Sequence, residues 1–214
     1  MESPLDNALN CNSSVSAETI TISPDLILDL IESVGIFPSS GLIPLNSYEN
    51  RVYQFVADDT KRYVVKFYRP QRWTKAQILE EHEFAKQLMD DEIPVVAPLI
   101  LNGTSLHEAS GYLFTIYPSV GGRCFENDNL DHLEWMGRFI GRIHLIGQKQ
   151  SFQHRPSMQL ADYLDGASEQ LLASELLPMS LETPFITILE QLCSATKTFY
   201  QTDGIKQFRL HGDC

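Results

Sequence analysis

The sequence predicts an α+β fold in two parts. Short alternating or β-branched runs dominate residues 42–118, and helical spacing dominates the residues that follow Gly121 and Gly122. With 214 residues the chain can form one large domain or two small ones. Its 43% hydrophobic and 21% charged residues are typical of a globular protein with a real core, which excludes a collagen or a coiled-coil rod.

Three segments are expected along the chain. Residues 1–22 are rich in Ser, Asn, Thr and acidic residues and have too little apolar surface to offset the entropy of ordering, so we expect a disordered N-terminal arm. Residues 23–117 are expected to form a first lobe that contains the sheet. Residues 118–214 are expected to form a connection followed by a helical second lobe.

The first lobe is predicted to hold two helices and five strands. Ser23 and Pro24 supply an N-cap and a first-turn proline for a helix that Gly35 ends. Thr74 and Gln77 have the T-x-x-Q spacing of a capping box, which opens a second helix. The predicted strands are LIPL, RVYQFV, RYVVKFY, PVVAPLIL and YLFTIYP, at residues 42–45, 51–56, 62–68, 94–101 and 112–118. Helices of the second lobe are predicted at 130–147, 158–173 and 181–202.

The net charge argues against some classes of binding partner, and the cysteines indicate the cellular compartment. Sixteen basic against 28 acidic residues give a net charge of −12, which repels nucleic acid and an anionic membrane surface. The four cysteines, at positions 11, 124, 193 and 214, form no CxxC pair and fit reduced thiols in the cytoplasm. No run approaches about 20 apolar residues, and the N-terminus lacks the pattern of a signal peptide.

Lys66 and Glu81 are the first candidates for a charged site. Lys66 lies in an otherwise aromatic and β-branched run, where a buried ammonium would require an anion. From this residue alone, a lysine at a strand edge that reaches water is the favoured explanation. Glu81 has Ile78, Ala85 and Leu88 at i−3, i+4 and i+7, so it shares their inward helical face. An acid there could hold the lysine against nucleotide phosphates, although a solvated helix face remains the alternative.

A third candidate lies near the last residue. Asp213 follows His211 and Gly212, and this H-x-D pattern resembles the catalytic loop of kinases, in which the aspartate accepts a hydroxyl proton. Gly-Asp is also a common turn. The order lysine, acid and H-x-D along the chain is the order found in kinases.

Several strings together resemble one family closely: bacterial stress-response serine/threonine protein kinases with the fold shared by aminoglycoside phosphotransferases and choline kinases. The strings are LNSYENRVYQF (45–55), VVKFYRPQRW (64–73), ILEEHEFAKQL (78–88), IPVVAP (93–98), YPSVGGR (117–123) and RLHGD (209–213). The resemblance runs from about residue 24 to the last residue. It makes the expected fold a two-lobed protein-kinase-like one, with an antiparallel five-stranded N-terminal lobe and an incomplete helical C-terminal lobe.

The resemblance also implies roles for individual residues. It places Ser47 on a loop over the ATP phosphates, Lys66 on those phosphates, and Glu81 against Lys66. It makes Asp213 the catalytic base. It makes Tyr117, Pro118 and Ser119 the hinge beside the adenine.

The resemblance implies ATP and Mg²⁺ as cofactors, but no metal ligand within this chain. In the family an asparagine shortly after the catalytic aspartate and a later aspartate bind magnesium, and here Cys214 is the last residue. The expected function is therefore an ATP-dependent serine/threonine protein kinase, truncated after Asp213 and inactive in this form. A monomer that acts on a Ser or Thr of a protein substrate is expected. The alternatives are a small-molecule kinase of the aminoglycoside or choline type, and a non-catalytic fragment that binds a nucleotide or a partner.

Overall fold

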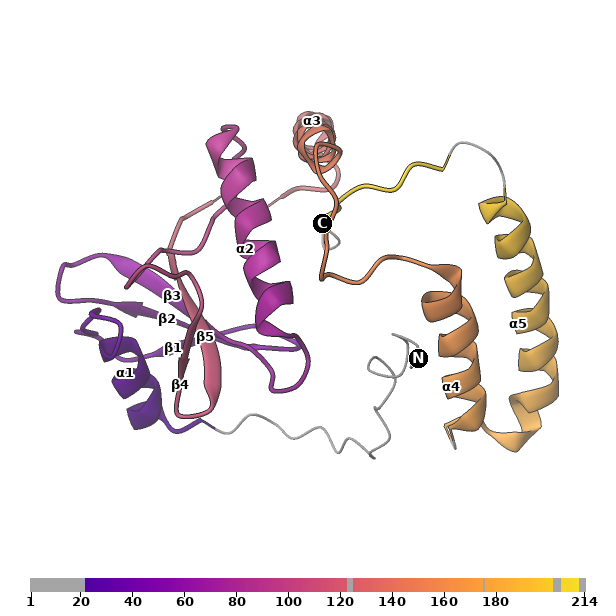
Figure 1. The fold of residues 1–214 in the computed structure, drawn as a ribbon, viewed down its shortest axis with the longest axis horizontal. Helices are drawn as coiled ribbons and strands as arrows, with labels where there is room; N and C mark the ends of the chain where they lie inside the picture. Colours follow the sequence, from indigo (N-terminus) through magenta and orange to yellow (C-terminus); the bar gives the residue numbers. More distant parts are fainter. Residues whose placement is uncertain (1–21, 123–124, 175, 202–204, 212–214) are drawn as a thin grey trace, which may run out of the picture. The chain divides into compact units, whose positions relative to one another are not determined.

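The computed structural model describes residues 22–122, 125–174, 176–201 and 205–211 (Figure 1). These residues form two compact units. The first comprises the described residues up to His82 together with Val96–Gly122, and the second comprises Glu83–Val95 and the described residues after Gly122. Within the described parts of the chain, no helix is long and apolar enough to cross a membrane.

The first unit is built on a five-stranded antiparallel sheet, as predicted. Its strands are β1 (Ile43–Leu45), β2 (Arg51–Val56), β3 (Arg62–Phe67), β4 (His107–Ala109) and β5 (Tyr112–Pro118). They lie in the order β1-β2-β3-β5-β4, so β3 is central. The expected α+β architecture is confirmed.

One predicted strand is wrong. The run at 94–101 forms no strand, and the fifth strand is β4, which the prediction missed. Pro94 and Pro98 lack the N–H groups that a ladder needs. From this run, the N–H of Leu99 donates to the carbonyl of Ile116 at 2.8 Å, and Leu101 forms an isolated bridge with Thr104. β4 escaped notice because its three residues, HEA, show no apolar alternation.

Helix α1 (Pro24–Glu32) covers one face of this sheet (Figure 1). The Ser23 side chain accepts a hydrogen bond from the N–H of Leu26 at 3.3 Å, which confirms the predicted N-cap. Gly35 follows the helix with φ +85°, a conformation that L side chains rarely adopt. Ile22, at the boundary of the expected arm, is buried in the same core. That core combines α1 with alternate residues of three strands: Phe55, Val65, Phe67, Phe114 and Ile116.

Helix α2 (Lys75–Asp90) begins with the predicted capping box. The N–H of Gln77 donates to Thr74 Oγ1 at 3.3 Å, and the N–H of Thr74 donates to Gln77 Oε1 at 2.9 Å. Ile78 and Leu88 are fully buried, so the predicted inward face of this helix is correct. His82 and Phe84 are buried as well, which widens the inward face beyond the predicted stripe.

The second unit is helical. It contains α3 (Leu130–Gly147), the π-helical turn η2 (Ala161–Gly166), α4 (Ala167–Ala173) and α5 (Met179–Tyr200). The Asn129 side chain caps α3 by accepting from the N–H groups of Asp131 and His132. A small apolar core joins α3 to the second half of α2, through Ile143, Ile146, Phe84, Leu88 and Ile93. The predicted helices at 130–147 and 181–202 are confirmed to within two residues, and the helix predicted at 158–173 begins at Ala161.

Candidate functional site

The sheet face opposite α1 carries two rows of cross-strand neighbours. Paired residues on adjacent antiparallel strands project to the same side, so the strand register defines each row. One row contains Leu45, Val52, Lys66 and Thr115, and the next contains Ile43, Gln54, Val64 and Tyr117. Ile43 and Leu45 are exposed apolar side chains. This face therefore places one lysine beside a partly apolar surface.

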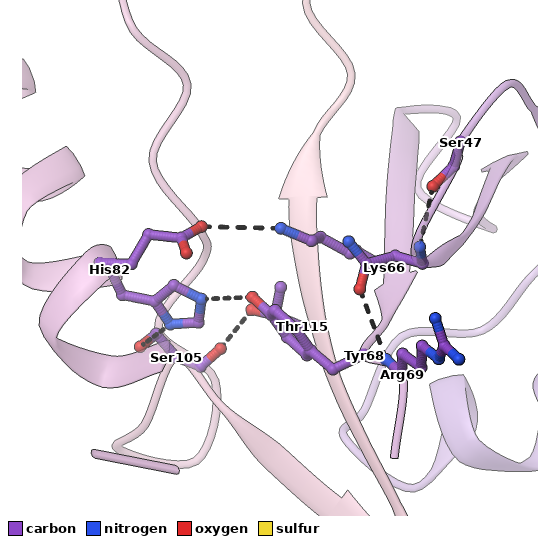
Figure 2. Close-up of polar contacts among 9 residues, drawn as sticks. Ser47, Lys66, Tyr68, Arg69, His82, Ser105 and Thr115 are labelled. Carbon is purple, nitrogen blue, oxygen red and sulfur yellow. Dashed lines mark hydrogen bonds and ion pairs between the residues drawn. The ribbon is translucent and has the colours of Figure 1, made fainter. Parts of the chain in front are cut away.

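Lys66 and Glu81 meet on this face. Lys66 Nζ lies 3.6 Å from Glu81 Oε1, with the two side chains 23% and 38% exposed (Figure 2). The pair is neither buried nor fully solvated, so the ammonium remains reachable by a further anion. Glu81 reaches Lys66 because the capping box sets the phase of α2 and buries Ile78 one turn earlier.

A chain of buried polar contacts lies beside the pair (Figure 2). The Tyr68 hydroxyl and His82 Nε2 are 2.8 Å apart, and His82 Nδ1 is 2.8 Å from Ser105 Oγ. The Thr115 hydroxyl donates to the carbonyl of Ser105. Lys66 Nζ lies 4.8 Å from the centre of the Tyr68 ring, which is the geometry of a cation–π contact. The four residues that form this chain of contacts are all buried: Tyr68, His82, Ser105 and Thr115.

Burial sets the ionisation of two groups here. Desolvation lowers the pKa of His82 to about 4, opposed by the charge of Glu81 and assisted by the charges of Lys66 and His107. Desolvation raises the pKa of Tyr117 to about 12, although a hydrogen bond with Tyr68 opposes the shift. At neutral pH His82 is therefore uncharged and Tyr117 keeps its proton.

The loop that contains Ser47 is tied to the segment after β3. Ser47 Oγ accepts the N–H of Asn50 at 3.2 Å, and Asn50 Oδ1 accepts the N–H of Arg69 at 3.4 Å (Figure 2). Glu49 forms an ion pair with Arg72. Because Ser47 Oγ already accepts a bond, its own O–H is the group left to donate to a ligand.

The three residues expected as a hinge lie at the end of β5. Tyr117 pairs with Val64, and Pro118 pairs with Tyr63. Ser119 donates its N–H to the carbonyl of Arg62 at 2.9 Å and accepts from Gln54 Nε2 at 2.7 Å. Tyr117 and Gln54 belong to the row next to that of Lys66. Four of the six residues expected at the nucleotide site therefore lie on strands or directly after one, while Ser47 lies in a loop and Glu81 on α2.

Asp213 lies outside the described residues, so the structure does not place it. Arg209, four residues earlier, is buried in the second unit. Its guanidinium donates to Gln87 Oε1 at 2.9 Å and to the carbonyl of Ile146 at 3.2 Å, and it stacks 4.4 Å from the Phe84 ring centre. The segment that leads to the H-x-D pattern is thereby anchored to α2 and to the end of α3.

Sequence reasoning missed Tyr68, His82 and Ser105. The one available signal was the position of His82 four residues after Ile78, which puts it on the buried side of α2. In the parts of the chain that the structure covers, no group of three His, Cys, Asp or Glu side chains could hold a metal ion.

Comparison with known proteins points to one family. A family model described as "Phosphotransferase enzyme family" matches residues 41–214. Stress response kinase A of Escherichia coli (strain K12) is 49% identical over 194 residues, which cover 91% of this chain and 59% of that protein. Serine/threonine protein kinase RdoA of Salmonella typhimurium (strain LT2) is 48% identical with the same coverage. The chain thus spans 59% of the length of these curated relatives.

Two solved structures share the fold. Amicoumacin kinase hAmiN, in complex with AMP-PNP, Ca²⁺ and Ami, superposes with a TM-score of 0.66 at 17% identity, over 86% of this chain and 55% of that one. A microcompartment-associated aminopropanol kinase superposes with a TM-score of 0.65 at 18% identity, over 85% and 59%. At these identities the likeness concerns the fold alone.

Proposed function

Because the chain belongs to the phosphotransferase enzyme family, we propose that it is the first part of an ATP-dependent protein kinase that phosphorylates serine or threonine. The observation that carries the proposal is the Lys66–Glu81 pair on a partly apolar sheet face. An ammonium held by one carboxylate, with room for a second anion, is suited to bind ATP phosphates. The relatives at 48–49% identity that are named as stress-response or serine/threonine kinases support a protein substrate.

Each residue has a distinct part in the proposed reaction. Lys66 binds the phosphates, Glu81 holds Lys66, and the Ser47 hydroxyl with nearby backbone N–H groups covers the phosphates. The exposed apolar side chains Ile43 and Leu45 offer a surface to the adenine ring. Tyr117, Pro118 and Ser119 border the adenine through backbone groups at the end of β5.

The chemistry is a single phosphoryl transfer. The substrate hydroxyl oxygen forms a bond to the γ-phosphorus, the bond to the β,γ-bridging oxygen breaks, and ADP leaves with that electron pair. Asp213 accepts the hydroxyl proton. The protein contributes by positioning and by neutralising charge rather than by covalent chemistry. Mg²⁺ would neutralise phosphate charge, with ligands that follow Asp213 in the family and lie outside these 214 residues.

A small-molecule kinase is the second candidate, since both fold neighbours are named as kinases of small molecules. The difference in identity, 48–49% against 17–18%, favours the protein kinase. The test is to incubate the complete protein, extended past residue 214, with labelled ATP and Mg²⁺. One arm supplies a protein substrate and the other an aminoglycoside or an amino alcohol. Label on serine or threonine supports the proposal, and label on the small molecule alone replaces it with the second candidate.

A further inference from the structure

A closed set of contacts surrounds Lys66 within the first unit (Figure 2). Thr115 faces Lys66 across β3 and β5, and its hydroxyl donates to the carbonyl of Ser105. Ser105 Oγ contacts His82 Nδ1, and His82 Nε2 contacts the Tyr68 hydroxyl, each at 2.8 Å. The Tyr68 ring then returns to Lys66, 4.8 Å from Nζ. Apart from the contact between Lys66 and Tyr68, each link joins residues at least ten positions apart, so the lysine's surroundings are fixed from several elements.

His82 connects this set to Glu81. The two residues are adjacent on α2. Tyr68 follows Lys66 by two residues and lies directly after the end of β3. The Lys66–Glu81 ion pair joins β3 to α2, and the Tyr68–His82 hydrogen bond joins the residue directly after β3 to the same helix. The ion pair is half-exposed, whereas the hydrogen bond is buried and shielded from water.

The chemistry of the buried link favours rigidity. A neutral histidine has one donor nitrogen and one acceptor nitrogen, which suits two hydroxyl partners that can each donate or accept. Burial keeps His82 neutral at physiological pH. A neutral His82 adds no positive charge that would compete with Lys66 for Glu81.

We infer that Tyr68 and His82 are positioning residues for Lys66, with the Tyr68 ring supporting the ammonium and His82 fixing the Tyr68 ring against the helix that presents Glu81. The inference deepens the proposed function, because it rests on Lys66 as the phosphate-binding group. A lysine side chain loses much rotamer freedom when it binds a ligand. Support from the ring and the carboxylate restricts it before ATP arrives.

The test uses kinetics of the complete protein. Tyr68→Leu, which removes the ring, should lower kcat/KM for ATP about tenfold, as expected for loss of a partly desolvated cation–π contact. Tyr68→Phe keeps the ring and should restore kcat/KM to within about threefold of the wild type. His107→Gln is the matched control: a buried histidine of the same unit that packs on Phe114, 5.4 Å between ring centres, and makes no contact with Lys66 in the described residues.

A second arm separates positioning from general stability. In a Lys66→Ala background, Tyr68→Leu should cause no further loss of kcat/KM, because the residue through which it acts is absent. An additional tenfold loss there would overturn the inference, as would wild-type kinetics of Tyr68→Leu. If Tyr68→Leu melts below the assay temperature, His82→Gln takes its place, with an expected loss of about threefold that also vanishes in the Lys66→Ala background. Wild-type kinetics of His82→Gln would then overturn the inference.

Different results would refute the proposed function of Lys66 and the positioning role of Tyr68 and His82. Full activity of Lys66→Ala would refute the proposed function of the lysine itself. Loss of activity in Lys66→Ala, combined with no effect of Tyr68→Leu or His82→Gln, would refute the positioning role alone.

Discussion

The carbonyl oxygen of Arg209 occupies the place where a side chain on Gly147 would begin. A Cβ atom built on Gly147 would lie 2.3 Å from that oxygen, far inside van der Waals contact. The Arg209 N–H donates to the Gly147 carbonyl at 3.4 Å, so the close approach also satisfies a carbonyl at the end of α3. Of the three glycines of α3, Gly147 is the one against which the chain that leads to Asp213 packs, and it has no side chain to displace that chain.

Gly147→Ala should therefore destabilise the protein. The added methyl group must move a backbone carbonyl, at a cost of about 1 to 3 kcal/mol in the free energy of unfolding. Gly141→Ala is the control, because nothing lies within 4 Å of its Cβ position and alanine favours a helix. Urea titration of both variants checks this, and equal midpoints would show that Arg209 does not approach Gly147 in solution.

Lys66→Ala should remove most phosphoryl transfer in the complete protein and leave the fold intact, because it deletes a charge without emptying core volume. Lys61→Ala, at an exposed position on the β2–β3 turn, should have no effect. Glu81→Gln should reduce kcat/KM less than Lys66→Ala, and Glu80→Gln should reduce it least. A larger effect of Glu80→Gln than of Glu81→Gln would contradict the assigned helix face. Initial-rate kinetics with circular dichroism as the folding control measure all four.

Ser47→Ala should raise the Michaelis constant for ATP by a few-fold. A few-fold rise corresponds to about 1 kcal/mol, which is less than the roughly 1.5 to 3 kcal/mol of a fully formed hydrogen bond to a charged group. The variant loses the hydroxyl donor to the phosphate and also the acceptor for the Asn50 N–H. Ser33→Ala is a suitable control, since that hydroxyl donates to the Leu30 carbonyl at the end of α1. Unchanged ATP kinetics in Ser47→Ala would move the phosphate contact to another part of the loop.

His82 should make stability depend on pH. Its pKa is about 4 in the folded state against 6.5 for an unperturbed histidine, so the unfolded state takes up the proton first as pH falls. The stabilisation is complete above about pH 6.5 and declines toward pH 4. Between pH 7.5 and 5 the wild type should lose about 2 kcal/mol more unfolding free energy than His82→Gln. Parallel losses in urea titrations at the two pH values would mean that His82 is protonated or exposed in the folded state.

The 214-residue polypeptide by itself should transfer no phosphate at a measurable rate, while the protein extended past residue 214 should be active. The described residues supply the lysine and its acid partner, whereas the magnesium ligands of the family follow the aspartate of the H-x-D pattern. Without bound metal the charge on the phosphates is not neutralised. Several large apolar side chains of α5 are exposed, including Met179, Ile188 and Leu192, so the short polypeptide should also tend to aggregate. Phosphate transfer by a monomeric 214-residue protein would contradict both expectations.

Local signals in the sequence were sufficient for most elements of the fold. The capping box at Thr74 and Gln77 and the N-cap at Ser23 depend on contacts within three residues, so their spacing predicts them reliably. The segment 94–101 was misread because its apolar residues resemble a strand, while its prolines restrict pairing to single contacts. Apolar content alone does not distinguish a paired strand from a buried extended segment.

The candidate site was predictable only in part, for a similar reason. Glu81 could be chosen over its neighbours because helical spacing is local, and the structure brings it to Lys66. The polar set of Tyr68, His82 and Ser105 depends on strand register and on loop positions, which join residues up to 23 positions apart. No pattern of spacing in one sequence encodes such a long-range match.

The capping box of α2 also limits which changes in length the chain can accept. Glu81 lies seven residues after Thr74, close to two helical turns, and each residue of a helix advances its face by about 100°. One residue inserted between Gln77 and Glu81 would turn the carboxylate away from Lys66 and carry His82 out of the buried set. An insertion among residues 69–73, before the helix begins, would leave that phase unchanged. Natural variants with functional sites should therefore differ in length before Thr74 and keep a constant count from Thr74 to Glu81.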